Sequence, residues 1–122
     1  MKNIAKELEN LPIYDQILQS IQFDFEKNQV QICIEYFDSQ KNDYENLYIY
    51  LKNIHSFSSE YPKDITFSPN GVHSVSCRTI NEKEYESHWI FQIQDMPLWV
   101  VKIGFSDLEM VGNCIKNFKN IA

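Results

Sequence analysis

Apolar and polar residues alternate through most of the chain between Ile17 and Phe105. Alternation with a period of two places every second side chain on one face of a β-strand. The clearest run, Val30 to Tyr36, has an apolar or aromatic side chain at every second position. Related runs predict further strands at Ile17 to Phe25, Leu47 to Lys52, Ile65 to Phe67, Val72 to Ile80, His88 to Ile93 and Trp99 to Phe105.

Short polar segments separate these strands. Asp38 to Asn46 is predicted to be an exposed loop, and His55 to Ser59 to end the third strand. Pro69-Asn70-Gly71 is typical of a tight hairpin turn, because Asn and Gly tolerate positive φ. Short connections favour neighbouring antiparallel strands, since a parallel crossover needs about a dozen residues or more. The sequence therefore predicts a single curved antiparallel meander sheet or half-barrel of about seven strands.

Helical spacing occurs only near the two ends of the chain. Ile4, Leu8 and Leu11 predict a short helix at about Lys2 to Asn10, which Pro12 interrupts. At the other end, a capping-box pattern begins at Ser106, and apolar residues recur at helical spacing from Leu108 to Phe118. This pattern favours a C-terminal helix. The alternative is a strand from Leu108 to Gly112 followed by a short helix, because glycine weakens a helix by about 1 kcal/mol.

The predicted class is thus α+β and mostly β, and 122 residues suffice for one domain, residues 1–122. The chain has 11 basic and 17 acidic residues and a net charge of −6. Its single arginine, Arg78, leaves little with which to neutralise a phosphate backbone, so direct binding of nucleic acid is not expected. No stretch approaches the ~20 apolar residues of a membrane span, and we expect a cytoplasmic protein.

Recognisable catalytic or cofactor motifs are missing from the sequence. Cys33, Cys77 and Cys114 form no Cys-x-x-Cys pair, and the three histidines lack metal-ligand spacing. The three glycines are too far apart for a phosphate-binding loop, and no Gly-x-Ser-x-Gly occurs. We therefore expect no metal, cofactor or enzymatic activity. The enzymatic alternative would use His88 or His55 with Asp24 or Asp95.

Two acidic patches are candidates for binding a protein partner. Tyrosine concentrates in protein interfaces, and neighbouring carboxylates can meet Lys or Arg of a partner. The first patch surrounds the loop after the second strand and comprises Glu35, Tyr36, Asp38, Asp43, Tyr44, Glu45, Tyr48 and Tyr50. The secondary patch comprises Glu82, Glu84, Tyr85 and Glu86, with His88 beside it. The alternative for the first patch is an ordinary polar loop beside a sheet that is covered on both sides.

A wider pattern resembles a known class of protein. Tyr14 to Asp24, followed by Val30 to Tyr36 and by a strand that ends at Lys52-Asn53-Ile54, resembles small bacterial immunity proteins of polymorphic toxin and contact-dependent growth inhibition systems. The resemblance implies a non-enzymatic inhibitor, monomeric or homodimeric, that binds the toxin domain of the same cell. A basic nuclease toxin would suit an acidic inhibitor, because nucleases need positive surfaces to hold phosphates.

A second functional class follows from the predicted curvature of the sheet. A half-barrel can bind a small ligand on its concave side. Trp89, Trp99 and the tyrosines would then form the walls of the pocket.

Overall fold

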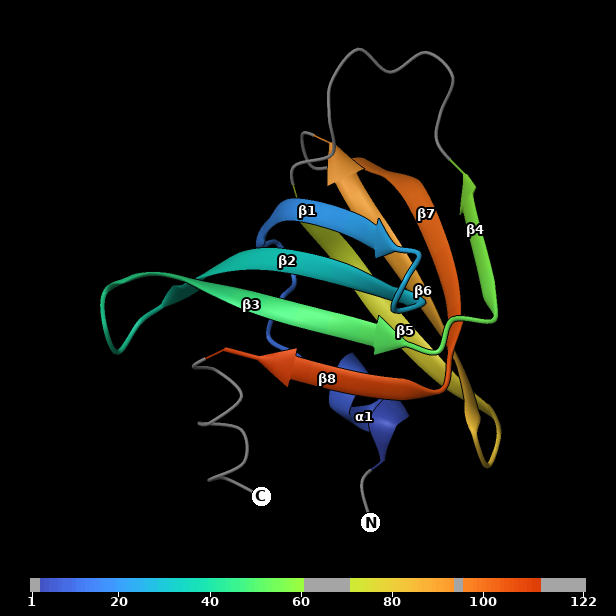
Figure 1. The fold of residues 1–122 in the computed structure, drawn as a ribbon. Helices are drawn as coiled ribbons and strands as arrows, with labels where there is room; N and C mark the ends of the chain where they lie inside the picture. Colours follow the sequence, from blue (N-terminus) through green and yellow to red (C-terminus); the bar gives the residue numbers. More distant parts are fainter. Residues whose placement is uncertain (1–2, 61–70, 94–95, 113–122) are drawn as a thin grey trace.

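The computed structural model describes residues 3–60, 71–93 and 96–112 and contains one short helix and one antiparallel sheet (Figure 1). The elements in chain order are α1 (Ile4–Glu9), β1 (Ile17–Asp24), β2 (Gln29–Asp38), β3 (Asp43–Lys52), β4 (Ser56–Glu60), β5 (Gly71–Asn81), β6 (Glu84–Ile93), β7 (Met96–Phe105) and β8 (Asp107–Val111). The eight strands are ordered β4-β7-β6-β5-β1-β2-β3-β8.

The sheet consists of two four-stranded halves whose strands cross at a large angle (Figure 1). One half is β1-β2-β3-β8 and the other is β5-β6-β7-β4. A single residue pair, Ile17 and Gly71, joins β1 to β5. Gly71 therefore begins a strand, and its φ is not positive, so the predicted turn does not include it.

At the opposite corner, β3 continues into β4 and β7 continues into β8. The His55 N–H donates to the Gly104 carbonyl oxygen at 3.0 Å, and the Ser106 N–H donates to the Lys52 carbonyl oxygen at 3.1 Å. Asn53 makes the bend between β3 and β4 with a φ of 56°, a left-handed conformation that asparagine adopts more readily than most residues. These bonds bring the two ends of the sheet together.

The core fills the space between the two halves. In the central strands β2 and β3, every second residue from Val30 and from Leu47 points inward, as the alternation predicts. The largest fully buried side chains are Trp89, Phe91, Phe105, Leu8, Leu11, Ile13, Ile32, Ile34, Leu47, Ile49, Leu51 and Ile103. This filled interior holds the outward-facing side chains of both halves on a rigid support.

Helix α1 covers the edge of β5 that β1 leaves unpaired. Its first turn is capped by the Asn3 side chain, which accepts the Lys6 N–H at 3.1 Å, and Ala5 and Leu8 are buried. The Glu9 carboxylate accepts the Cys77 N–H at 3.0 Å. A backbone donor that would otherwise lack a strand partner is thereby satisfied.

The predicted mostly β class and the N-terminal helix are confirmed, whereas the strand count and the strand order are wrong. The described residues form eight strands, because Ser56–Glu60 forms β4 instead of ending the third strand and Asp107–Val111 forms β8. The order is not a simple meander, because β4 pairs with β7 and β8 pairs with β3. The predicted strand at Ile65 to Phe67 lies outside the described residues.

The predicted C-terminal helix is also wrong for the residues up to Val111. Asp107–Val111 is β8, and its Leu108 and Met110 lie opposite Leu51 and Ile49 of β3. Pairing with a strand packs both apolar side chains, partly buried, against the core, which outweighs the helical spacing of the local sequence. The remainder of the predicted helix lies outside the described residues.

Candidate functional site

The outward side of the β1-β2-β3-β8 half is a continuous polar surface, which we call the outer face. Cross-strand partners share a face, so the register of the three ladders defines its members. They are Ile17, Ser20, Gln22 and Asp24 of β1, Gln29, Gln31, Cys33, Glu35 and Phe37 of β2, Tyr44, Asn46, Tyr48, Tyr50 and Lys52 of β3, and Asp107, Glu109 and Val111 of β8.

Negative charge predominates on the outer face. Its carboxylates are Asp24, Glu35, Asp107 and Glu109, and its strand residues include one cation, Lys52. A second cation, Lys27 of the turn between β1 and β2, lines the same hollow as Tyr50 and Lys52. The Lys52 ammonium forms an ion pair with Glu109 at 2.6 Å, which raises the pKa of the lysine. Asp107 also lies close enough to Lys52 to raise its pKa. The four carboxylates outnumber Lys52 and Lys27, so the face carries a net negative charge.

Aromatic side chains lie among these carboxylates. Tyr48 and Tyr50 are half-buried in the middle of β3. Toward the tip of the β2–β3 hairpin, the rings of Phe37 and Tyr44 meet edge to face with centroids 5.3 Å apart, and both stay about half exposed. Exposed aromatic rings beside charged groups are typical of surfaces that bind proteins.

The first predicted patch is divided by the sheet. Glu35, Tyr44, Tyr48 and Tyr50 belong to the outer face, with the Glu35 carboxylate accepting a hydrogen bond from Gln19 Nε2 at 2.8 Å. The other members are Tyr36, Asp38, Asp43 and Glu45, which have the opposite phase along β2 and β3.

These four residues differ in exposure. Tyr36 and Asp38 are buried, and the Asp38 carboxylate accepts the Gln40 N–H at 3.0 Å. Asp43 is exposed, and Glu45 forms an ion pair with Lys41 at 2.9 Å. Buried Tyr36 and Asp38 cannot reach a partner, so only half of the predicted patch shares one usable surface.

Cys33 lies in the centre of the outer face but is almost fully buried. Burial raises the pKa of its thiol, the nearby Glu35 charge raises it further, and a hydrogen bond from Tyr48 opposes both effects. A raised pKa disfavours the thiolate, which is the nucleophilic form. Cys33 is therefore a packing residue in the floor of this face.

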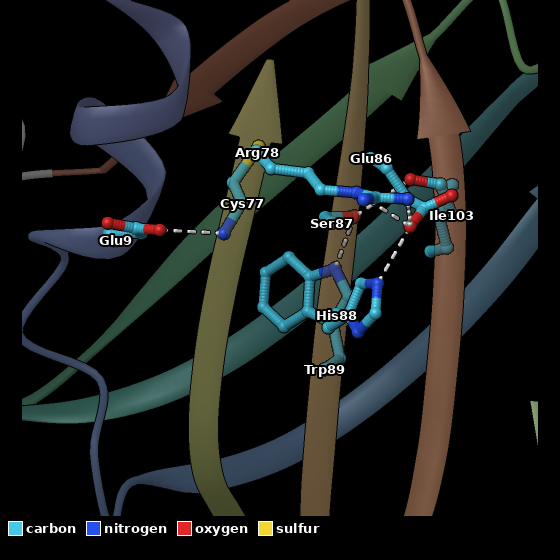
Figure 2. Close-up of polar contacts among 8 residues, drawn as sticks. All are labelled: Glu9, Cys77, Arg78, Glu86, Ser87, His88, Trp89 and Ile103. Carbon is cyan, nitrogen blue, oxygen red and sulfur yellow. Dashed lines mark hydrogen bonds and ion pairs between the residues drawn. The ribbon is translucent and has the colours of Figure 1, made fainter. Parts of the chain in front are cut away.

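The secondary patch contains a small ionic cluster on the other half of the sheet. Figure 2 shows the Glu86 carboxylate between Arg78 of β5 and His88 of β6, at 3.0 Å and 2.8 Å respectively. The hydrogen bond from His88 and the charge of Arg78 lower the pKa of Glu86. Tyr85 points to the other side and packs against Phe105, while Glu82 and Glu84 lie at the turn. Two of the four predicted acidic-patch members, Tyr85 and Glu86, thus already have intramolecular partners.

A pocket of about 140 Å³ adjoins this cluster, between α1 and β5. Its lining is Glu9, Ser76, Cys77, Arg78, Glu86 and His88. Burial and the nearby Glu9 charge raise the pKa of Cys77 to about 12. The thiol is therefore protonated at neutral pH and is a poor nucleophile.

The catalytic pairs considered from the sequence are not formed by the residues that the structure describes. His88 bonds Glu86, and the Asp24 carboxylate accepts the backbone N–H groups of Glu26 and Lys27 in its own turn. Asp95 lies outside the described residues. Within the described ranges, no group of three or more His, Cys, Asp or Glu side chains is arranged to hold a metal ion.

Helices long and apolar enough to cross a membrane are absent from the described part of the chain. Comparison with family models, with curated proteins and with solved structures gave no match.

Asp24, Asp107 and Glu109 of the outer face were not among the predicted binding residues. Their phase within β1 and β8 places them there, but the pairing of β8 with β3 joins residues more than fifty positions apart, such as Lys52 and Glu109. A local pattern carries no information on such pairing.

Proposed function

We propose that this chain is a bacterial immunity protein that binds and neutralises a cognate toxin domain through the outer face. The observation that carries the proposal is the combination of unbalanced carboxylates with aromatic side chains on one side of β1-β2-β3-β8. The proposal assigns the protein no catalytic step. Inhibition follows from covering the surface with which the toxin holds its substrate.

Electrostatics makes a basic nuclease domain the favoured partner. A protein that holds phosphates presents lysine and arginine side chains, and a complementary negative face accelerates association. The chain as a whole has a charge of −6, and the four carboxylates of the outer face outnumber its cation Lys52 and the adjacent Lys27. Long-range attraction and local complementarity therefore act in the same direction.

The aromatic residues supply the apolar part of the contact. Tyr44 is 53% exposed and Phe37 is 45% exposed, and they already pack against each other. Rings held in place before binding lose little conformational entropy when a partner covers them. We expect this pair, with Tyr48 and Tyr50 beside it, to form the centre of the interface and the carboxylates to form its rim.

The experiment is copurification with the C-terminal domain of the protein that the neighbouring gene encodes. The double variant Glu35→Lys/Glu109→Lys reverses two charges on the outer face, and we expect its affinity for the toxin domain to fall at least about tenfold. Thermal denaturation monitored by circular dichroism shows whether the variant remains folded.

The matched control is Glu82→Lys, which makes the same change at an exposed turn in the other half of the sheet. We expect it to bind like the wild type. A loss of binding with Glu82→Lys but not with the double variant would transfer the interface to the secondary patch and refute our assignment. Failure of the neighbouring domain to bind the wild type would refute the proposed function.

Binding of a small ligand on the concave side is the weaker alternative. The inner face around Trp89 is filled, and Trp89 itself is fully buried against Phe91, with ring centroids 6.1 Å apart. Trp89 therefore belongs to the packed core and is not the wall of an open pocket.

A further inference from the structure

Strand edges in this sheet are protected to different degrees. The free edge of β5 is covered by α1, with Glu9 accepting the Cys77 N–H. The strand at one end of the sheet, β8, carries Asp107 and Glu109, and charged side chains discourage pairing with another chain. The strand at the other end, β4, differs from both.

Strand β4 has the sequence Ser-Phe-Ser-Ser-Glu, and all five residues are exposed. It pairs with β7 in an unbroken register from Ser56 to Glu60, and its second edge has no strand partner among the described residues. It contains neither lysine nor proline nor a bulge, and its one charged residue, Glu60, lies at its end. No described residue pairs with the backbone N–H and C=O groups on that edge, so another strand can add there.

Exposed phenylalanines accompany this edge. Phe57 of β4 is 45% exposed and meets Phe23 of β1 edge to face, with ring centroids 6.0 Å apart. Phe25 packs against Phe23 with tilted rings whose centroids lie 4.6 Å apart, and it is 85% exposed. An apolar cluster beside an unpaired strand edge marks a surface that is stabilised when a partner covers it.

We propose that this partner is a second copy of the chain, which pairs antiparallel with β4 around a two-fold axis through Ser58. In this register Ser56 lies opposite Glu60 of the other copy, and Phe57 lies opposite Ser59. No two like charges lie opposite each other in this register. The two Phe57 residues are diagonal neighbours, close enough for their rings to touch. The sequence of β4 is thus self-complementary, as a two-fold interface requires.

Other registers are less favourable for the same residues. An axis at Glu60 would place two carboxylates opposite each other. An axis through Phe57 or through Ser59 would pair only three residues of β4 with the other copy of β4, because opposed residues must share a face of the sheet. Only the axis through Ser58 pairs all five residues of β4.

The interface is small, because a five-residue ladder and a few aromatic rings bury much less than the ~1,200 Å² of a tight complex. We therefore expect a reversible dimer that dissociates on dilution. The outer face belongs to the other half of the sheet, so pairing through β4 leaves it open. The dimer is thus independent of the proposed immunity function, and either can fail without the other.

The test is sedimentation velocity of the wild type and three β4 variants over about a hundredfold range of concentration. In Ser58→Glu the new carboxylate lies opposite Lys102 of its own chain, so the variant should keep its fold. Across the two-fold axis, however, it lies opposite the same new carboxylate of the second copy, and the two repel. We expect the dissociation constant of the dimer to rise about fivefold or more. Ser58→Thr is the matched neutral control and should dimerise like the wild type.

Ser56→Lys tests the register itself, since it places a lysine opposite Glu60 of the other copy at two symmetric positions. We expect this variant to dimerise more tightly than the wild type. Circular dichroism checks the fold of each variant. A wild type that remains monomeric throughout the range would overturn the proposal, and so would equal dimerisation of Ser58→Glu and Ser58→Thr.

Discussion

Replacing Ser87 with alanine tests the buried polar link inside β6. Trp89 Nε1 donates to Ser87 Oγ at 2.9 Å, and Ser87 Oγ donates to the Ile103 carbonyl oxygen at 3.1 Å. Serine and indole are both fully buried, so Ser87→Ala leaves the indole N–H without its partner and without water (Figure 2). An unsatisfied buried donor costs about 1–3 kcal/mol.

We therefore expect Ser87→Ala to lower the free energy of unfolding by about 2 kcal/mol. With an unfolding entropy of about 2.1 cal/mol/K per residue, this corresponds to a decrease in Tm of about 8 °C. Urea denaturation gives the free energy and differential scanning calorimetry gives Tm. The control is Ser76→Ala at an exposed position of the neighbouring strand, which should change stability by less than about 0.5 kcal/mol.

A double-mutant cycle identifies the cause of the loss. In a Trp89→Phe background the indole N–H is absent, so Ser87→Ala should cost about 1 kcal/mol less than it does in the wild type. Equal costs in the two backgrounds, or a cost below about 0.5 kcal/mol in the wild type, would refute this account of the core.

Three other predictions concern the helix, the ionic cluster and the buried thiol. Leu8→Ala should destabilise the protein by about 2–5 kcal/mol in urea denaturation, because it removes a fully buried side chain between α1 and the sheet; a cost below about 1 kcal/mol would show that α1 does not contribute to the core. The folded state lowers the pKa of Glu86, so the stability that its ionised form contributes is complete above its ordinary pKa of about 4.3 and is lost as pH falls through the lower, folded value. The difference in stability between wild type and Glu86→Gln should therefore be present at neutral pH and shrink in acid, and a difference that does not change with pH would contradict it. Cys77, with a pKa raised to about 12, should resist iodoacetamide in the native protein at pH values near 8 and react after denaturation, as mass spectrometry can measure; rapid labelling of the native thiol would show that it is not buried.

Much of the sheet follows from local alternation. Val30, Ile32 and Ile34 face the core while Gln31 and Glu35 face outward, as the period of two requires. Tyr36 has the same phase as Val30, Ile32 and Ile34, and it is buried with them. The alternation therefore predicts a core position for Tyr36 and excludes it from the binding patch.

Strand β4 and strand β8 could not be predicted in the same way. β4 is exposed at every position, so burial imposes no alternation on its sequence, and only its pairing with β7 makes it a strand. In β8, Leu108 and Val111 have helical spacing, but pairing with β3 packs Leu108 against the core and leaves Val111 half exposed. In both cases the deciding contacts join distant parts of the chain.

In the candidate site, too, some members follow from local alternation and others from pairing between distant strands. Glu35, Tyr48 and Tyr50 have a common phase on two strands joined by a hairpin, so their shared face follows from local sequence. Glu109 joins them only because β8 lies beside β3. The outer face is therefore predictable in its centre but not at its β8 edge.

The most direct test of the central claim, that the acidic outer face binds a basic toxin domain, is the salt dependence of the association rate. Stopped-flow or surface plasmon resonance measurements with the domain encoded by the neighbouring gene give this rate at increasing ionic strength. We expect the rate to fall steeply with salt for the wild type and much less for Glu35→Lys/Glu109→Lys, because screening acts on the charges that steer the encounter. An association rate that is independent of salt, or equally dependent in both proteins, would contradict the claim.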